Sequence, residues 1–308
     1  MTRILLPLLL LALSLAPGGP QAPSERGKGR IHLDVVALDK NDQPVVDLKP
    51  EEVEVWIGQF RAPIESFTVV TPDANPSGRL TVLILDDVTL PIHQVARAQD
   101  VARRFVNKML PNDRMAIVSL DGSSMELTDD RTVLFKAIDR FNALSGGLIP
   151  IDRVGEHVLK TIGTLSKQLV EAGSQRKTIV AIGSGWVFDR PIPPARIGMD
   201  PRKEWIGAMQ AMAVSNISLY VIDPGGVSTA RADSGGSGFA RETGGLAFIS
   251  TNDLTAAADR ILRESANYYL LGVGDPPVGR GADLREVDVR VLRKGVTVRA
   301  RKLITGGT

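Results

Sequence analysis

The chain has 308 residues, of which 43% are hydrophobic and 23% charged, as expected for a soluble globular protein with a substantial core. This length fits one large domain with a small accessory domain. The net charge is only +2, and no stripe of lysine and arginine interleaves with aromatic residues, so no nucleic-acid partner is expected. The chain has no cysteine and three histidines, which excludes a disulfide framework, a thiol nucleophile and a cysteine-ligated or histidine-rich metal site.

The N-terminus has the pattern of a secretory signal peptide, which we predict over residues 1–22. Arg3 precedes an almost purely apolar run from Ile4 to Ala16, and Pro17-Gly18-Gly19-Pro20 then breaks any helix. The run is too short to span a bilayer comfortably. We therefore expect a periplasmic or extracellular protein with no membrane span after cleavage. The alternative is an uncleaved N-terminal helix that anchors the chain.

Residues 31–71 are predicted to form a small β module. The stretch from Ile31 to Leu38 alternates with a period near two, which indicates a strand. Two further strands are predicted at 53–57 and 64–70, with a turn at Gly58-Gln59. Residues 71–78 are a linker rich in turn-forming residues.

From Arg79 onward the pattern changes to strands that alternate with helices. Residues 80–85 (LTVLIL) are a continuous apolar run, which is typical of a strand buried on both faces of a parallel sheet. Later strands are predicted at 115–120, 178–182, 217–222, 246–249 and 268–273, with helices at 92–110, 132–144, 153–172, 201–214, 238–243 and 254–266. This alternation predicts an α/β fold with a doubly wound, mostly parallel sheet over residues 79–273.

The tail returns to β character over residues 284–304. Val287 to Val291 alternates cleanly, and a second strand from Val296 to Leu303 follows the Lys294-Gly295 turn. We expect this C-terminal β-hairpin to pack with the small β module rather than to extend the main sheet.

Polar side chains at the predicted strand ends form the candidate site, because ligands of open α/β sheets bind beyond the carboxyl ends of the strands. The candidate ligands for a metal ion are Asp86, Asp87, Thr89, Asp121 and Ser184. Oxygen ligands of this kind suit Mg²⁺ or Ca²⁺. The structural alternatives are that Asp86 accepts backbone N–H groups at the strand end and that Asp87 N-caps the following helix.

These segments, taken in order, resemble a von Willebrand factor A domain, and in particular the bacterial VWFA-related family first described in acidobacterial proteins. The resemblance covers nearly all of the mature chain and is carried by the order and spacing of its fragments: VVALDKNDQPVVDLKPEEVEVWIGQFRAPIESF, LTVLILDDVTL, DRMAIVSLDGSSMELTDD, RKTIVAIGSG, NISLYVIDPGG, ARETGGLAFISTNDL and YYLLGV. It implies a metal-ion-dependent adhesion site with an Asp-x-Ser-x-Ser motif after the first strand, plus a distant Thr and Asp.

This chain departs from that motif at most positions. Asp86 matches the first ligand, but Val88 and Leu90 occupy the two serine positions. The loop that would supply the Thr reads Gly146 to Pro150 without a hydroxyl, and the segment that would supply the last Asp reads Gly183-Ser184-Gly185. The resemblance therefore implies a degenerate site, with no cofactor or a weakly bound Mg²⁺ or Ca²⁺.

No enzyme motif is complete, so the chain is expected not to be an enzyme. Val88 stands where the haloacid-dehalogenase motif has its second Asp, and Gly183-Ser184-Gly185 lacks the spacing of a nucleophile elbow. Gly235 to Gly238 lacks the Lys-Ser/Thr of a phosphate-binding loop.

A binding function fits better, because loops on a rigid scaffold form an adaptable recognition face. Trp186 and Phe188 are candidate contact residues for a protein partner, with local core packing as the alternative. We predict an exported protein that mediates protein–protein binding or adhesion. The alternatives are an envelope-assembly or structural component and a divalent-metal-dependent hydrolase.

Overall fold

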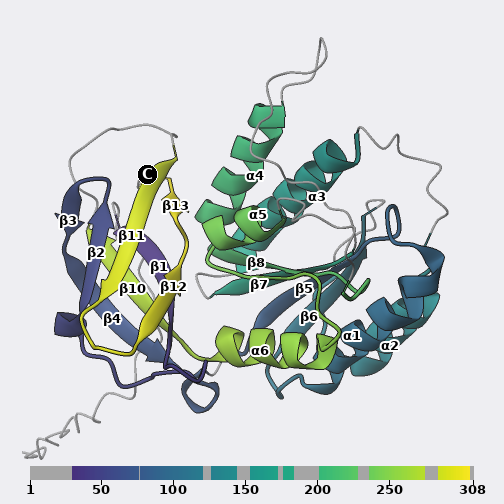
Figure 1. Cartoon of the computed structure of the whole chain (residues 1–308), viewed down its shortest axis with the longest axis horizontal. Coiled ribbons are helices and arrows are strands. Elements are labelled where there is room, and N and C mark those ends of the chain that lie inside the picture. Colours follow the sequence, from purple (N-terminus) through teal and green to yellow (C-terminus); the bar gives the residue numbers. More distant parts are fainter. Residues whose placement is uncertain are drawn as a thin grey trace, which may run out of the picture.

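The computed structural model describes residues 30–75, 77–120, 126–143, 153–172, 176–183, 201–227, 236–274 and 284–305. These residues form two layered units side by side, an antiparallel β-sandwich and an α/β unit (Figure 1). The predicted signal peptide lies outside the described residues. Among those described, no helix is long and apolar enough to cross a membrane.

The α/β unit is built on a five-stranded sheet in which every neighbouring pair is parallel. Its strand order is β6-β5-β7-β8-β9, with bounds β5 (Leu80–Leu85), β6 (Arg114–Ser119), β7 (Lys177–Ile182), β8 (Ile217–Ile222) and β9 (Ala247–Phe248). All residues of β5, β7 and β8 are buried. The continuous apolar runs thus form buried parallel strands, which confirms the predicted α/β class.

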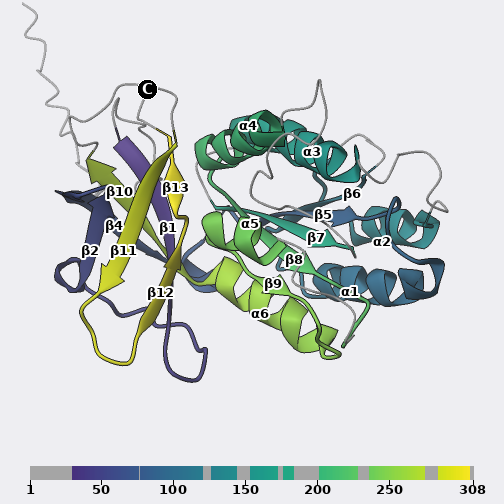
Figure 2. The same cartoon turned by 45° about the horizontal axis from the view of Figure 1, so that its top comes forward.

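Helices cover both faces of this sheet (Figure 2). One layer holds α3 (Val154–Gln168), α4 (Pro201–Val214) and α5 (Gly236–Glu242), and the other holds α1 (Val95–Asn107), α2 (Arg131–Arg140) and α6 (Leu254–Ala266). Because successive strand residues point to opposite faces, Val82 and Ile84 pack with the first layer, and Leu83 and Leu85 pack with the second. Asp253 N-caps α6 by accepting a hydrogen bond from the Ala256 amide at 2.8 Å.

The sandwich consists of two four-stranded sheets with the orders β12-β1-β10-β4 and β13-β11-β2-β3. The bounds are β1 (Arg30–Leu38), β2 (Val53–Ile57), β3 (Phe60–Ala62), β4 (Ile64–Val70), β10 (Tyr268–Gly274), β11 (Arg285–Val291), β12 (Thr297–Ala300) and β13 (Leu303–Ile304). The C-terminal strands pair with the N-terminal ones, β11 with β2 and β12 with β1. Short 3₁₀ segments occur at η1 (Pro50–Glu52), η2 (Pro72–Ala74), η3 (Ile92–Gln94) and η5 (Leu169–Ala172).

One strand prediction is wrong. The sequence placed 268–273 as the last strand of the parallel sheet, but β10 lies in the sandwich, where it pairs antiparallel with both β1 and β4. Its burial explains the error, because the centre of a sandwich sheet also demands a nearly continuous apolar strand. The described α/β unit therefore ends with α6, at Ala266.

The sandwich is joined to the α/β unit at the amino edge of the parallel sheet, through buried polar groups. Arg301 donates to the Asn216 side chain at 3.0 Å, directly before β8, and the Lys302 amide donates to the Glu242 carbonyl at 2.8 Å, where α5 ends. The fully buried Glu264 of α6 accepts hydrogen bonds from Tyr220 and from Arg299 at the junction. The carboxyl edge lies at the other end of the strands, away from this junction.

Asp34 of β1 is a buried carboxylate at the same junction. Neither of its oxygens makes a hydrogen bond within the described residues, although Arg176, Arg301 and Lys177 contribute favourable charge. Burial nevertheless dominates and raises the pKa of Asp34 above its ordinary value, while burial lowers the pKa of Arg301 to about 10. The junction thus carries an electrostatic cost at Asp34.

Candidate functional site

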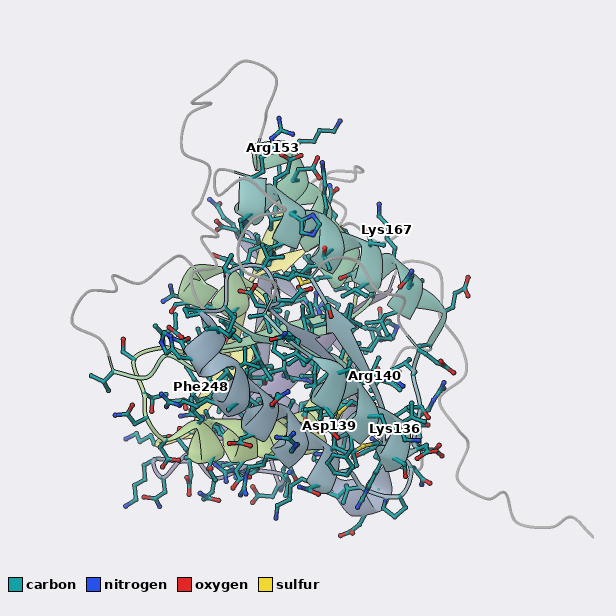
Figure 3. The ribbon with its side chains drawn as sticks, turned by 90° about the vertical axis from the view of Figure 1, so that its right-hand side faces the viewer. Lys136, Asp139, Arg140, Arg153, Lys167 and Phe248 are labelled. Atoms are coloured by element: carbon teal, nitrogen blue, oxygen red, sulfur yellow. The ribbon has the colours of Figure 1, made fainter. Side chains whose placement is uncertain are left out.

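Asp86 and Asp87 lie at the carboxyl end of β5, and both are almost completely buried. Figure 3 looks at the α/β unit from the side away from the sandwich. Phe248 marks the end of β9, Arg153 precedes α3, and Lys136, Asp139 and Arg140 mark α2. The two carboxylates are adjacent in sequence, but they bind different parts of this edge.

Asp86 organises its own loop. One carboxylate oxygen accepts hydrogen bonds from the amides of Val88 at 3.1 Å and Thr89 at 2.7 Å. The other oxygen accepts a hydrogen bond from the Thr89 hydroxyl. Asp86 therefore has the structural role that the sequence offered as the alternative to metal binding, and Thr89 is its partner.

Asp87 connects two strands. Its carboxylate accepts a hydrogen bond from the Leu120 amide at 3.0 Å, just beyond the end of β6. The alternative prediction, that Asp87 N-caps the following helix, is wrong, because Pro91 and Gln94 occupy the N-cap positions of η3 and α1. Asp87 instead holds the ends of β5 and β6 together.

The other predicted site residues lie outside the described part of the chain. These are Asp121 and Ser184 among the candidate ligands, and Trp186 and Phe188 among the candidate contact residues. Of the predicted set, the structure describes Asp86, Asp87 and Thr89, which lie together after β5.

The described residues fit a divalent cation poorly. Mg²⁺ and Ca²⁺ need six or more converging oxygens, whereas both oxygens of Asp86 accept hydrogen bonds within its own loop. Leu90, at the second serine position of the motif, is a buried core residue. Within the described ranges, no group of three or more His, Asp or Glu side chains is arranged to hold a metal ion.

The connections at the two edges of the parallel sheet differ in length. At the amino edge the elements are joined by the short segments 108–113, 173–176, 215–216 and 243–246. At the carboxyl edge the segments 86–91 and 249–253 are also short, but the segments 141–153, 183–200 and 223–235 are much longer. The start of α3 lies at this edge, since the His157 ring lies 2.5 Å from the Leu120 carbonyl oxygen. Long connections are thus concentrated on the side away from the sandwich.

Three further residues at the carboxyl edge are candidates for contact with a partner, and the sequence did not single them out. Ile92 of η3 and Val227 after β8 are 71% and 64% exposed. The Arg97 guanidinium lies beside Gly226, where a Cβ atom would be 3.0 Å from its nearer nitrogen. Periodicity could not reveal this group, because these residues come from separate elements that only the fold brings to one edge.

Comparisons with known proteins identify no family for this chain. No family model matches it, and no curated protein matches it. Among solved structures, the chain is similar to the crystal structure of manganese-loaded Plasmodium vivax TRAP protein, at 11% sequence identity over 77% of this chain and 96% of that chain, with a TM-score of 0.36. Such a distant likeness adds no argument about function, and the description of the fold rests on the strand order and helix layers themselves.

Proposed function

We propose that this chain is an exported protein with a von Willebrand factor A-type unit that binds another protein through the carboxyl-edge loops, without requiring a metal ion. The chain acts as an adhesion or binding module and not as an enzyme. The motif resemblance supports the type of unit, and the apolar run at the N-terminus supports export.

The unequal length of the connections carries this proposal. Binding residues are concentrated in loops that a rigid scaffold positions, and here the long segments 183–200 and 223–235 follow the carboxyl ends of β7 and β8. The segment 183–200 includes Trp186 and Phe188, which are residue types favoured at the centres of protein interfaces. The sandwich contacts the opposite edge of the sheet.

The hydrogen bonds of the two aspartates support binding without a metal ion. Asp86 and Asp87 each stabilise the loop or strand end that presents the neighbouring segments. Their function is then to shape the edge, and the recognition groups come from the loops.

Affinity capture from an envelope extract tests the proposal, with the immobilised mature chain as bait and EDTA or Mg²⁺ in the buffer. We expect the same protein to be recovered in both buffers, and to be lost when Trp186 and Phe188 are both replaced by Ala. Leu292→Ser is the matched control, because Leu292 is 60% exposed but lies at the end of the sandwich strand β11. Recovery that requires Mg²⁺, or recovery by the double variant at the wild-type level, would refute the proposal.

A further inference from the structure

The two most exposed large apolar side chains of the described residues belong to elements at the carboxyl edge. Ile92 and Val227 have the two highest exposed fractions, 71% and 64%. Ile92 belongs to η3, which continues directly into α1, and Val227 follows the turn after β8. Isolated exposed apolar residues are common on protein surfaces, so this pair needs a further feature to indicate binding.

Arg97 supplies that feature. It lies in the first turn of α1, is half-buried, and places its guanidinium beside Gly226, the residue before Val227. Within the part of the chain that the structure describes, Arg97 has no ion pair or hydrogen bond. The other arginines of α1 differ, because Arg103 pairs with Asp139 and Arg104 pairs with Asp259, each at 2.8 Å.

Acidic residues on the elements around Arg97 have other partners, and Asp100 of the same helix pairs with Arg103 at 3.2 Å. Asp223 accepts a hydrogen bond from the Gly225 amide at 2.7 Å, and Asp253 caps α6. Asn252 accepts from the Val227 amide at 3.3 Å, which fixes the turn beside Arg97. The surface thus presents one partly desolvated guanidinium beside the turn that carries Val227, on the helix that directly follows Ile92.

We propose that Ile92, Arg97 and Val227 form a contact surface for an acidic segment of the protein partner. This inference rests on the proposed function and names the chemistry that the carboxyl edge recognises. A partner Asp or Glu pairs with Arg97 through two parallel N–H···O bonds, and an adjacent apolar side chain covers Ile92 and Val227. The aliphatic flanks exclude water from the ion pair and so strengthen it.

Charge complementarity favours a protein segment over a nucleic acid or an anionic membrane. Polyanions bind to clusters of several unpaired cations, whereas Arg97 is a single unpaired arginine on a helix whose other arginines carry ion pairs. The net charge of the whole chain is only +2. A single carboxylate beside an apolar residue is the group that matches this surface.

Selection from a random peptide library displayed on phage tests the inference, with the full mature chain as the target. We expect enriched peptides to carry Asp or Glu next to an apolar residue, and to bind Arg97→Gln about tenfold or more weakly, as for a side chain at the centre of a contact. Ile92→Ser and Val227→Ser should weaken the same peptides, and added salt should also weaken them. Arg103→Gln is the matched control on the same helix and should bind like the wild type.

The outcomes separate this inference from the proposed function. Peptides that bind Arg97→Gln normally but fail on the Trp186→Ala/Phe188→Ala variant would overturn the inference and leave the proposed function standing. No enrichment, or enrichment of peptides without acidic residues, would also overturn it. Binding of phosphatidylglycerol vesicles or a single-stranded oligonucleotide that is lost in Arg97→Gln would assign the surface to a polyanion instead. Thermal melting of each variant verifies that it is folded.

Discussion

At the scale of single residues, the two strand-end aspartates have roles that their sequence positions do not reveal. Their location was predictable, because a parallel strand presents its carboxyl end at the binding edge. The partners were not, since the Leu120 amide that Asp87 binds comes from another strand and the Asp86 bonds depend on the path of the loop. The sequence shows which carboxylate oxygens can accept hydrogen bonds, and only the fold shows which donors bind them.

Asp87→Ala is expected to lower the free energy of unfolding by about 1–3 kcal/mol, because it leaves the buried Leu120 amide without its acceptor. Asp87→Asn keeps an acceptor oxygen and should retain most of the stability. Urea unfolding of both variants checks this.

Melting temperatures with and without Mg²⁺ or Ca²⁺ should be equal for the wild-type chain. A rise in melting temperature that depends on Asp87 would instead make Asp87 a metal ligand.

Asp34 gives a stability effect that depends on pH. Its pKa is raised in the folded chain by burial, so its contribution is fully present below the ordinary value of 3.8 and is lost as the pH rises through the raised pKa. Asp34→Asn resembles the protonated form. The variant should therefore be more stable than the wild type at neutral pH, and the difference should vanish in acid. Urea unfolding across this range tests the sign, and a variant that is less stable at neutral pH would contradict it.

At the scale of elements, local patterns predicted which segments are strands and helices better than they predicted the pairing of the strands. Continuous apolar runs identified β5, β7 and β8, and amphipathic spacing identified α1. The same kind of run misplaced β10, because burial on both faces does not distinguish a parallel sheet from the centre of a sandwich. Strand partners depend on contacts between distant segments, which periodicity does not contain.

The N-cap of α2 is a local sequence signal whose contribution to stability can be measured. Asp130 accepts hydrogen bonds from the Thr132 amide at 2.7 Å and the Val133 amide at 3.4 Å, and the first of these bonds is the main cause of its lowered pKa. Asp130→Ala should cost about 0.5–2 kcal/mol of unfolding free energy. The neighbouring exposed Asp129→Ala is the control and should change stability little. Equal losses in the two variants would show that the cap contributes nothing.

At the scale of the whole molecule, the buried groups at the junction make the two units depend on one another. Glu264 accepts hydrogen bonds from the Tyr220 hydroxyl at 3.1 Å, from Arg260 at 3.0 Å and from Arg299 of the sandwich. The sequence did not predict this network, because its members come from both units and none belongs to a motif. It connects the sheet that presents the loops to the unit at its opposite edge.

Glu264→Ala should therefore destabilise the chain by about 3 kcal/mol, since it removes a fully buried carboxylate that pairs with the partly buried Arg299 and accepts from Tyr220. Calorimetry of the wild type should show one transition for both units. The exposed Glu286→Ala is the control. A wild-type chain that melts in two separate steps would mean that the junction does not couple the units.

The position of β10 also determines how this protein can be divided. Val70, the last residue of β4, pairs directly with Tyr268, the first residue of β10. The α/β unit is therefore an insertion into the sandwich, and its two ends meet at one pair of residues in a β-ladder. Replacing residues 71–267 with an Asn-Gly turn would join β4 and β10 as an ordinary two-residue hairpin. Because β4 and β10 end side by side, another domain whose termini lie close together could be inserted between them in place of the α/β unit.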